Sequence, residues 1–262
     1  MPYVDTHCHL DHHEGLSVSE QVERARTAGV GLMVTIGTDM ASSTQAVSTA
    51  RRFEGVHACV GIHPNDAMEA SDRVLEVIAR LTEEPEVVAV GETGLDYYRD
   101  HTTPGQQAAA FRAHIDLARE RDKTLVIHCR EAWDDCLDLL EDARAPERVV
   151  MHCFSGDVDV AKRCAEHGWY MSFAGNVTFK NAADLREAAA VVPDELLLTE
   201  TDSPFLTPHP HRGKPNDPSY VPYVLETLAE VQQRPLAELE ATVEANARRV
   251  FALPAAGAVA TA

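Results

Sequence analysis

Two histidines near the N-terminus, His7 and His9, are spaced so that they can act together. They lie at the end of a short run that begins at Tyr3 and is typical of a β-strand. Side chains alternate between the two faces of a strand, so His7 and His9 would point one way and Cys8 the other. Two neighbouring imidazoles supply part of a metal site, which commonly takes three protein ligands in an enzyme. Alone, the pair fits a structural role as well as a metal-binding one.

Other residues of the types that bind metals follow the later apolar runs in the same way. They stand where a predicted strand ends, and they are His63, Glu92, His128, His152 and Asp202. In a barrel of parallel strands, all carboxyl ends meet at one face, and that face holds the active site. Histidines and carboxylates from several strands would converge there, which predicts a functional site.

Six positions make up the candidate ligand set. They are His7, His9, Glu92, His128, His152 and Asp202. Six ligands exceed the need of one catalytic zinc but suit two divalent metal ions that share a carboxylate. Glu92 is the candidate bridge because a carboxylate has two oxygens. The other ligands would divide into His7, His9 and Asp202 around one ion, and His128 and His152 around the other. Mixed imidazole and carboxylate ligands favour Zn²⁺, Mn²⁺ or Fe²⁺ and suit Mg²⁺ less well.

The elements that position these residues follow from short apolar runs alternating with longer helical patterns. Eight strands are expected at Tyr3–His7, Gly31–Ile36, Val56–Ile62, Val87–Gly91, Thr124–His128, Arg148–His152, Trp169–Phe173 and Leu196–Thr201. Helices are expected at Ser17–Ala28, Ala41–Phe53, Ser71–Glu83, Pro104–Arg121, Glu131–Ala143, Val158–His167, Ala182–Val192, Val221–Gln232 and Leu236–Phe251. Continuously apolar strands suit a parallel sheet buried on both faces. Eight βα units predict an α/β fold of the (β/α)8 TIM-barrel type, with an open doubly wound sheet as the alternative.

Local residue choices mark several helix boundaries. Ser17 and Ser71 are expected as N-caps, and Pro104 suits the first turn of a helix. Gly29 and Gly168 suit the position just after a helix ends.

Composition limits the possible classes of protein. The 262 residues contain no linker or repeat, so residues 1–253 are expected to form one domain, followed by a flexible tail over 254–262. No apolar stretch approaches 18 residues, so no membrane span is expected, and the predicted location is cytoplasmic. The net charge of −19 opposes broad electrostatic contact with nucleic acid, but not a local site where metals and a few arginines meet one phosphate.

The six cysteines form no CxxC pair and are interpreted as buried thiols in a reducing compartment. Cys8, Cys129 and Cys153 each neighbour a candidate ligand. Alternation along a strand places these three on the outer face of the sheet.

Five short motifs stand out in the sequence: Asp5–His9, Gly91–Asp96, His152–Gly156, Glu200–Pro204 and Arg212–Asn216. Together they resemble those of the TatD family of metal-dependent hydrolases. The likeness runs from Val4 to Phe251, and all six candidate ligands match the family pattern. The resemblance implies an amidohydrolase-type barrel, a pair of bound divalent metals and deoxyribonuclease activity, which would be exonuclease-like. DNA or a small phosphodiester is the expected substrate, and a monomer or small homo-oligomer the expected state.

Asp202 is expected to act in catalysis as well as in metal binding. A bound metal lowers the pKa of water towards about 7 and so activates it for hydrolysis at neutral pH. Asp202 would orient that water and accept its proton, because carboxylates do this within hydrogen-bond reach. A role as ligand alone is the alternative. Glu200, two residues earlier on the same face, is a candidate hydrogen-bond partner of a ligand histidine.

Four further residues are candidates for substrate binding. His63 would hold a phosphate oxygen or protonate a leaving group, with a merely packed histidine as the alternative. Arg130 shares a face with His128 if that strand continues, and would hold a phosphate through two hydrogen bonds; a salt bridge to Glu131 or Asp134 is the alternative. Arg212 and Lys214 lie in the loop after the last strand, where barrels often bind phosphate; charges exposed to solvent in the loop are the alternative. The loop residues Asp96, Tyr98 and Arg99 are expected to contribute an ion pair that shapes their loop.

Two other functions remain open from the sequence. The first is hydrolysis of a C–N or ester bond in a small molecule by the same pair of metals, since fold and metals support both reactions equally. The second is a non-catalytic metal-binding protein. A complete ligand set together with a water-activating carboxylate opposes the second.

Overall fold

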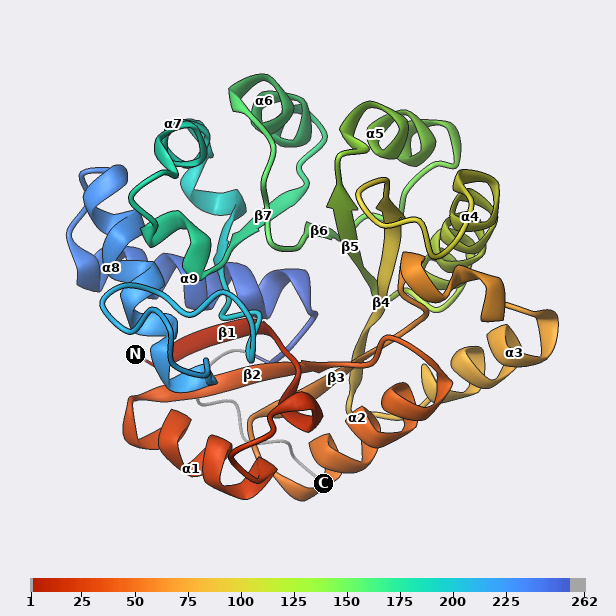
Figure 1. The fold of residues 1–262 in the computed structure, drawn as a ribbon, viewed down its shortest axis with the longest axis horizontal. Coiled ribbons are helices and arrows are strands. Elements are labelled where there is room, and N and C mark those ends of the chain that lie inside the picture. The colour runs from red at the N-terminus through yellow and green to blue at the C-terminus, as the bar shows by residue number, and fades with distance from the viewer. Residues whose placement is uncertain (1, 255–262) are drawn as a thin grey trace.

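The eight apolar runs form eight parallel strands, each hydrogen-bonded to the next in chain order. A computed structural model describes residues 2–254. The strands are β1 (Tyr3–Cys8), β2 (Val30–Ile36), β3 (Val56–Val60), β4 (Val87–Asp96), β5 (Thr124–Arg130), β6 (Val149–Met151), β7 (Tyr170–Phe173) and β8 (Leu197–Thr199). Helices surround the strands (Figure 1), and the predicted TIM-barrel fold is confirmed.

The sheet closes between its first strand and the segment that follows its last. The Asp202 N–H donates to the His7 carbonyl at 2.9 Å, and the His9 N–H donates to the Ser203 carbonyl at 2.8 Å. Cys8 and Ser203 form a parallel bridge between these hydrogen bonds. The closing seam therefore contains three of the candidate ligands on adjacent stretches of backbone.

The helices that cover the barrel match the predicted ones to within one or two residues at most ends. They are α1 (Val18–Thr27), α2 (Met40–Arg52), α3 (Asp72–Leu81), α4 (Pro104–Glu120), α5 (Trp133–Asp142), α6 (Val158–Glu166), α7 (Ala183–Val191), α8 (Val221–Val231) and α9 (Leu236–Val250). Among residues 2–254, none of the helices combines the length and apolar character that a membrane span requires.

The predicted helix boundaries are confirmed in position. The Ser17 hydroxyl accepts the Glu20 N–H and caps α1, whereas Ser71 stands at the N-cap of α3 without a side-chain hydrogen bond. Pro104 is the first residue of α4. Gly29 and Gly168 follow α1 and α6 with φ of 87° and 71°, a backbone conformation that glycine adopts without the steric cost of a Cβ.

β4 is longer than predicted. It was expected to end at Gly91, but its pairing with β5 continues to Asp96, with a register irregularity between Val90 and Thr93. Gly91 and Gly94 both have φ of 139°, and a Cβ at either would lie within 2.3 Å of a β5 carbonyl oxygen. These glycines therefore allow the strand to continue against its neighbour, although glycine in sequence suggests that a strand ends.

Three strands end earlier than predicted, because the chain leaves the sheet before the site residues. β3 ends at Val60, β6 at Met151 and β8 at Thr199. Beyond β6 and β8, Cys153 and Asp202 have φ of 43° and 53°, in the left-handed region that interrupts the alternation of a strand.

That interruption corrects the interpretation of one cysteine. Cys8 and Cys129 are buried in the core, as predicted. Cys153 is only partly buried and lies in the lining of the cavity described below, because its left-handed backbone no longer follows the alternation of β6. All six cysteines are free thiols. The tail predicted over 254–262 lies, apart from Pro254, outside the described residues.

Candidate metal centre

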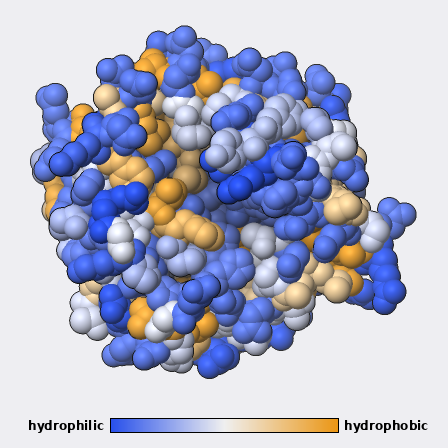
Figure 2. Space-filling view, viewed as in Figure 1, coloured by the Kyte–Doolittle hydropathy of each residue, from blue (hydrophilic) through white to orange (hydrophobic). Residues whose placement is uncertain are grey.

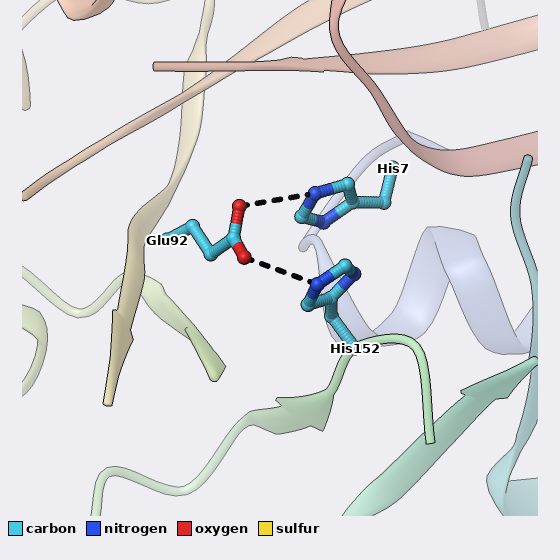
Figure 3. Close-up of side chains that lie close together, drawn as sticks. All are labelled: His7, Glu92 and His152. Atoms are coloured by element: carbon cyan, nitrogen blue, oxygen red, sulfur yellow. Dashed lines mark ion pairs between the residues drawn. The ribbon is translucent and has the colours of Figure 1, made fainter. Parts of the chain in front are cut away.

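The carboxylate of Glu92 lies at the centre of a cluster of histidines at the carboxyl ends of the strands. The residue is 3% exposed. Its Oε2 is 3.3 Å from His7 Nε2, and its Oε1 is 3.1 Å from His152 Nε2 (Figure 3). Oε1 also lies 2.9 Å from Nδ1 of His128. The two oxygens thus face two groups of imidazoles, which is the orientation that a bridging carboxylate requires.

The first group consists of His7, His9, Asp202 and Oε2 of Glu92. The His7 and His9 Nε2 atoms are 3.3 Å apart, and His9 Nε2 is 3.4 Å from Asp202 Oδ1. Oε2 lies 3.3 Å from His7 and 3.8 Å from His9. Zinc bonds of about 2.0–2.1 Å place the ligand atoms of a tetrahedral site about 3.3–3.4 Å apart. The spacing of these donors therefore fits one tetrahedral metal ion.

The second group surrounds Oε1 of Glu92. His128 and His152 approach it as predicted, and His63 Nε2 also lies 3.5 Å away. Asp96 Oδ2 is 3.2 Å from the other ring nitrogen of His128, so His128 stands between two carboxylates. Burial lowers the pKa of His128, but hydrogen bonds with Asp96 and Glu92 outweigh it and raise the pKa to about 9.

Hydrogen bonding leaves a lone pair of His152 directed at the cluster. The Nδ1–H donates to Glu200 Oε1 at 2.9 Å, because a carboxylate can only accept. Nε2 then faces Oε1 of Glu92, and two acceptors 3.1 Å apart require a cation between them. Either a second proton on the imidazole or a metal ion meets that requirement, so the donor set fits a divalent metal.

The electrostatics keep both candidate carboxylate ligands ionised. Burial raises the pKa of Glu92, but the facing histidines, His152 foremost, outweigh it and hold the pKa well below its usual value. Burial likewise raises the pKa of Asp202, and the hydrogen bond with His9 and the nearby imidazoles bring it below its usual value. Both groups are therefore carboxylates at neutral pH, as metal ligands must be.

The cluster opens into a cavity of about 700 Å³ at the carboxyl end of the barrel. On this side of the molecule, hydrophobic residues gather beside a hollow near the centre (Figure 2). Within the described residues, the lining includes His63 and Arg130 but neither Arg212 nor Lys214. The structure thus brings two of the four predicted substrate-binding residues to the cavity.

Two of the three predicted cations, Arg130 and Arg212, make contacts that the sequence did not indicate. Arg130 makes no ion pair with Glu131 or Asp134 in the described chain; its guanidinium lies 3.6 Å from the ring centroid of Tyr98. Arg212 lies 3.9 Å from the ring centroid of Phe179 and donates to the Thr207 carbonyl. Lys214 is exposed.

Proteins of known family match this chain over almost its whole length. The sequence model described as TatD related DNase matches residues 4–252. The chain belongs to the TatD family. The metal-dependent hydrolase TatD of Mycobacterium tuberculosis, whose name calls it uncharacterized, is 42% identical over 258 residues, 95% of this chain and 98% of the relative. The 3'-5' ssDNA/RNA exonuclease TatD of Klebsiella pneumoniae is 38% identical over 245 residues, 91% of this chain and 93% of the relative.

A solved structure agrees with the sequence relatives. The crystal structure of a TatD homologue from Escherichia coli K12 matches with a TM-score of 0.90 and 30% identity, covering 96% of this chain and 98% of that one. The predicted TatD membership and the class of metal-dependent hydrolase are thereby confirmed.

The sequence analysis did not predict the contacts that two carboxylates, Asp96 and Asp5, make at this TatD-family site. Asp96 was expected to form an ion pair in its loop; instead its Oδ1 accepts the Tyr98 and Arg99 N–H groups, and its Oδ2 contacts His128. Asp5 is buried and accepts hydrogen bonds from the Thr201 N–H and hydroxyl and from the His7 N–H. The alternation of side chains along a strand could have indicated both contacts. Asp5 is two residues from His7, and Asp96 is four residues from Glu92, so each shares a strand face with a candidate ligand.

The predicted role of Glu200 leads to a test of the second donor group. Glu200→Gln removes the charge that orients His152, so the affinity for one metal ion is expected to fall about 10- to 100-fold. Competition titration of Mn²⁺ and Zn²⁺ against a chelating dye measures this. Glu244→Gln is the matched control, since Glu244 is a buried glutamate that pairs with Arg248 on α9, and its affinity should equal that of the unmodified protein. Equal affinity in Glu200→Gln would show that the charge of Glu200 does not contribute to metal binding.

Proposed function

We propose that this TatD-family hydrolase is a deoxyribonuclease that cleaves phosphodiester bonds near the ends of single-stranded DNA with two divalent metal ions. The observation that carries the proposal is the arrangement of Glu92, whose two oxygens face separate groups of histidines. The relative from Klebsiella pneumoniae is named as an exonuclease on single-stranded DNA and RNA, which supports the choice of substrate. We assign the six candidate ligands to these two ions.

Divalent ions held by these residues would supply Lewis acidity, which polarises a phosphoryl oxygen and lowers the pKa of water. Asp202 is placed to receive the proton that the attacking water loses. Its side chain lines the cavity and is 14% exposed, and its depressed pKa keeps it in the basic form at neutral pH. The left-handed backbone at this position turns the carboxylate towards the His7 and His9 pair.

His63 is better suited to bind substrate than metal. Its Nδ1 accepts the Asn65 N–H at 3.1 Å, so in the neutral ring the proton is on Nε2. Burial lowers the pKa of His63 to about 3, and the ring is therefore neutral at pH 7. His63 lines the cavity with Nε2 3.5 Å from Glu92 Oε1, and an Nε2–H there can donate to a phosphate oxygen, whereas it has no lone pair for a metal ion.

Two arginines provide the positive charge of the cavity. Among the described lining residues, Arg99 and Arg130 are the ones with a permanent positive charge. Tyr98 holds both, with guanidinium carbons 5.3 Å and 3.6 Å from its ring centroid. A guanidinium held on an aromatic ring keeps its N–H groups free for a phosphate.

A metal-reconstitution panel tests the proposed function. Purified protein is stripped with a chelator, reloaded with Mn²⁺, Zn²⁺ or Mg²⁺, and offered single-stranded DNA, duplex DNA, RNA, a small amide and a small ester. We expect metal-dependent shortening of single-stranded DNA, with slower cleavage of duplex ends. Faster turnover of the amide or ester than of every nucleic acid would instead support the small-molecule alternative.

Substitution at Asp202 separates proton transfer from metal binding. Asp202→Asn keeps one ligand oxygen but cannot accept the proton, so kcat should fall about 10²- to 10⁴-fold with only a modest loss of metal affinity. His128→Ala should lose metal and activity together, and added metal should partly restore both. The measurements are metal stoichiometry, kcat and DNA affinity, which Asp202→Asn should retain because Arg130 is unchanged. Near-normal kcat with full metal occupancy in Asp202→Asn would show that another group takes the proton.

The scarcity of cations at the cavity predicts a weak dependence on salt. Single-stranded DNA releases about 0.7 counterion for each phosphate neutralised. With Arg99 and Arg130 as the fixed charges, the slope of log(kcat/KM) against log[salt] should be no steeper than about −2. A series from low to moderate salt at constant free metal measures it. A much steeper slope would mean that a basic surface outside the cavity binds DNA.

A further inference from the structure

Phe205 exposes its ring although the loop that carries it is fixed. The residue follows β8, lines the cavity and is 54% exposed. Its own N–H donates to the Asp202 carbonyl at 2.9 Å. The fully buried Asn216 donates both to the Phe205 carbonyl and to the Thr201 carbonyl. The aromatic ring therefore stands in water on a backbone that does not need to be ordered when a ligand binds.

The following residue strengthens this anchorage. The Leu206 carbonyl lies against Gly175. A Cβ on residue 175 would lie only 1.9 Å from the Leu206 carbonyl oxygen. Ser203, two residues before Phe205, is hydrogen-bonded to β1 in the closing seam. The loop is thus held to both neighbours of β8 in the barrel, β1 and the segment after β7.

Phe205 also stands beside the first donor group. Its ring centroid is 5.9 Å from that of His9, in an edge-to-face arrangement. Arg99 follows β4 and Arg130 ends β5, which lie four and three strands away from β8 in the eight-stranded barrel. The cavity therefore has cations on one side, an aromatic ring on the other and the candidate metal centre between them.

We propose that Phe205 stacks against the base of the nucleotide whose phosphate reaches the metal centre. This inference rests on the proposed nuclease function and names the residue that selects an unpaired end. A base within a duplex is already stacked and paired, so it reaches Phe205 only after leaving its neighbours. Every base has a π-face, so any of the four bases can stack on Phe205. It also supplies affinity that does not depend on positive charge, which suits a chain with a net charge of −19.

Two variants isolate the stacking. Phe205→Leu keeps an apolar side chain but removes the ring, and Phe205→Tyr keeps the ring. The substrates are a single-stranded oligonucleotide and the same oligonucleotide with an abasic terminal nucleotide. Phe205→Leu should raise KM on the intact oligonucleotide about 5- to 100-fold, the usual contribution of one stacked base, and should barely change KM on the abasic one. Phe205→Tyr should resemble the unmodified protein on both.

A second exposed side chain on the same end of the barrel serves as control. Met68 is 67% exposed and outside the described cavity lining, so Met68→Ala should leave KM unchanged. Equal KM values for the unmodified protein and Phe205→Leu on the intact oligonucleotide would overturn the inference. Thermal melting of each variant checks that the fold is kept.

Binding without cleavage distinguishes this inference from the proposed function. A terminal 2-aminopurine in a cleavage-resistant phosphorothioate oligonucleotide loses fluorescence when its base stacks. Quenching by metal-loaded protein, lost in Phe205→Leu and kept in Phe205→Tyr, supports stacking even if no DNA is cleaved. Cleavage without such quenching overturns the stacking inference and leaves the nuclease function standing. A protein that neither binds nor cleaves any oligonucleotide overturns both.

Discussion

The site depends on one buried carboxylate whose charge must be matched. Removing an ionised carboxylate from water is costly unless partners compensate for the lost hydration. Five histidines have ring nitrogens between 2.9 and 3.8 Å from the oxygens of Glu92. Imidazoles without protons cannot balance a negative charge, so the cluster needs cations. Protons can serve, but they compete with one another among so many neighbouring rings, whereas a divalent ion satisfies several donors at once.

The candidate ligands of the cluster lie at points where the strands of the barrel depart from regular geometry. The irregular register of β4 sets Glu92 between its neighbours, and the glycine at position 91 lets β4 pass close to β5. β6 and β8 end early, and left-handed residues follow them. Regular strands build the wall, and their irregular ends direct the side chains inward. Such local departures from regular structure are frequent at functional sites.

Much of this arrangement could be predicted because it follows from alternation and topology. His7 and His9 share a face, and Glu200 contacts a candidate ligand histidine, as their spacing suggested. What remained hidden depended on backbone details. β4 was predicted to end at Gly91, but it continues to Asp96, so the contact between Asp96 and His128 was not predicted. The aromatic partners of Arg130 and Arg212 come from other segments of the chain, and no local pattern reveals such pairs.

The closing seam links the beginning of the chain to a point near its end. Asp5 and Thr201, which are hydrogen-bonded there, lie 196 residues apart in sequence. Contacts between such distant residues form only after a long loop has closed. The first donor group contains candidate ligands from both sides of the seam, so a chain still being synthesised has no complete group until β8 and the residues after it have emerged. If this group binds a metal ion as proposed, the capacity to do so is acquired late and coincides with completion of the barrel.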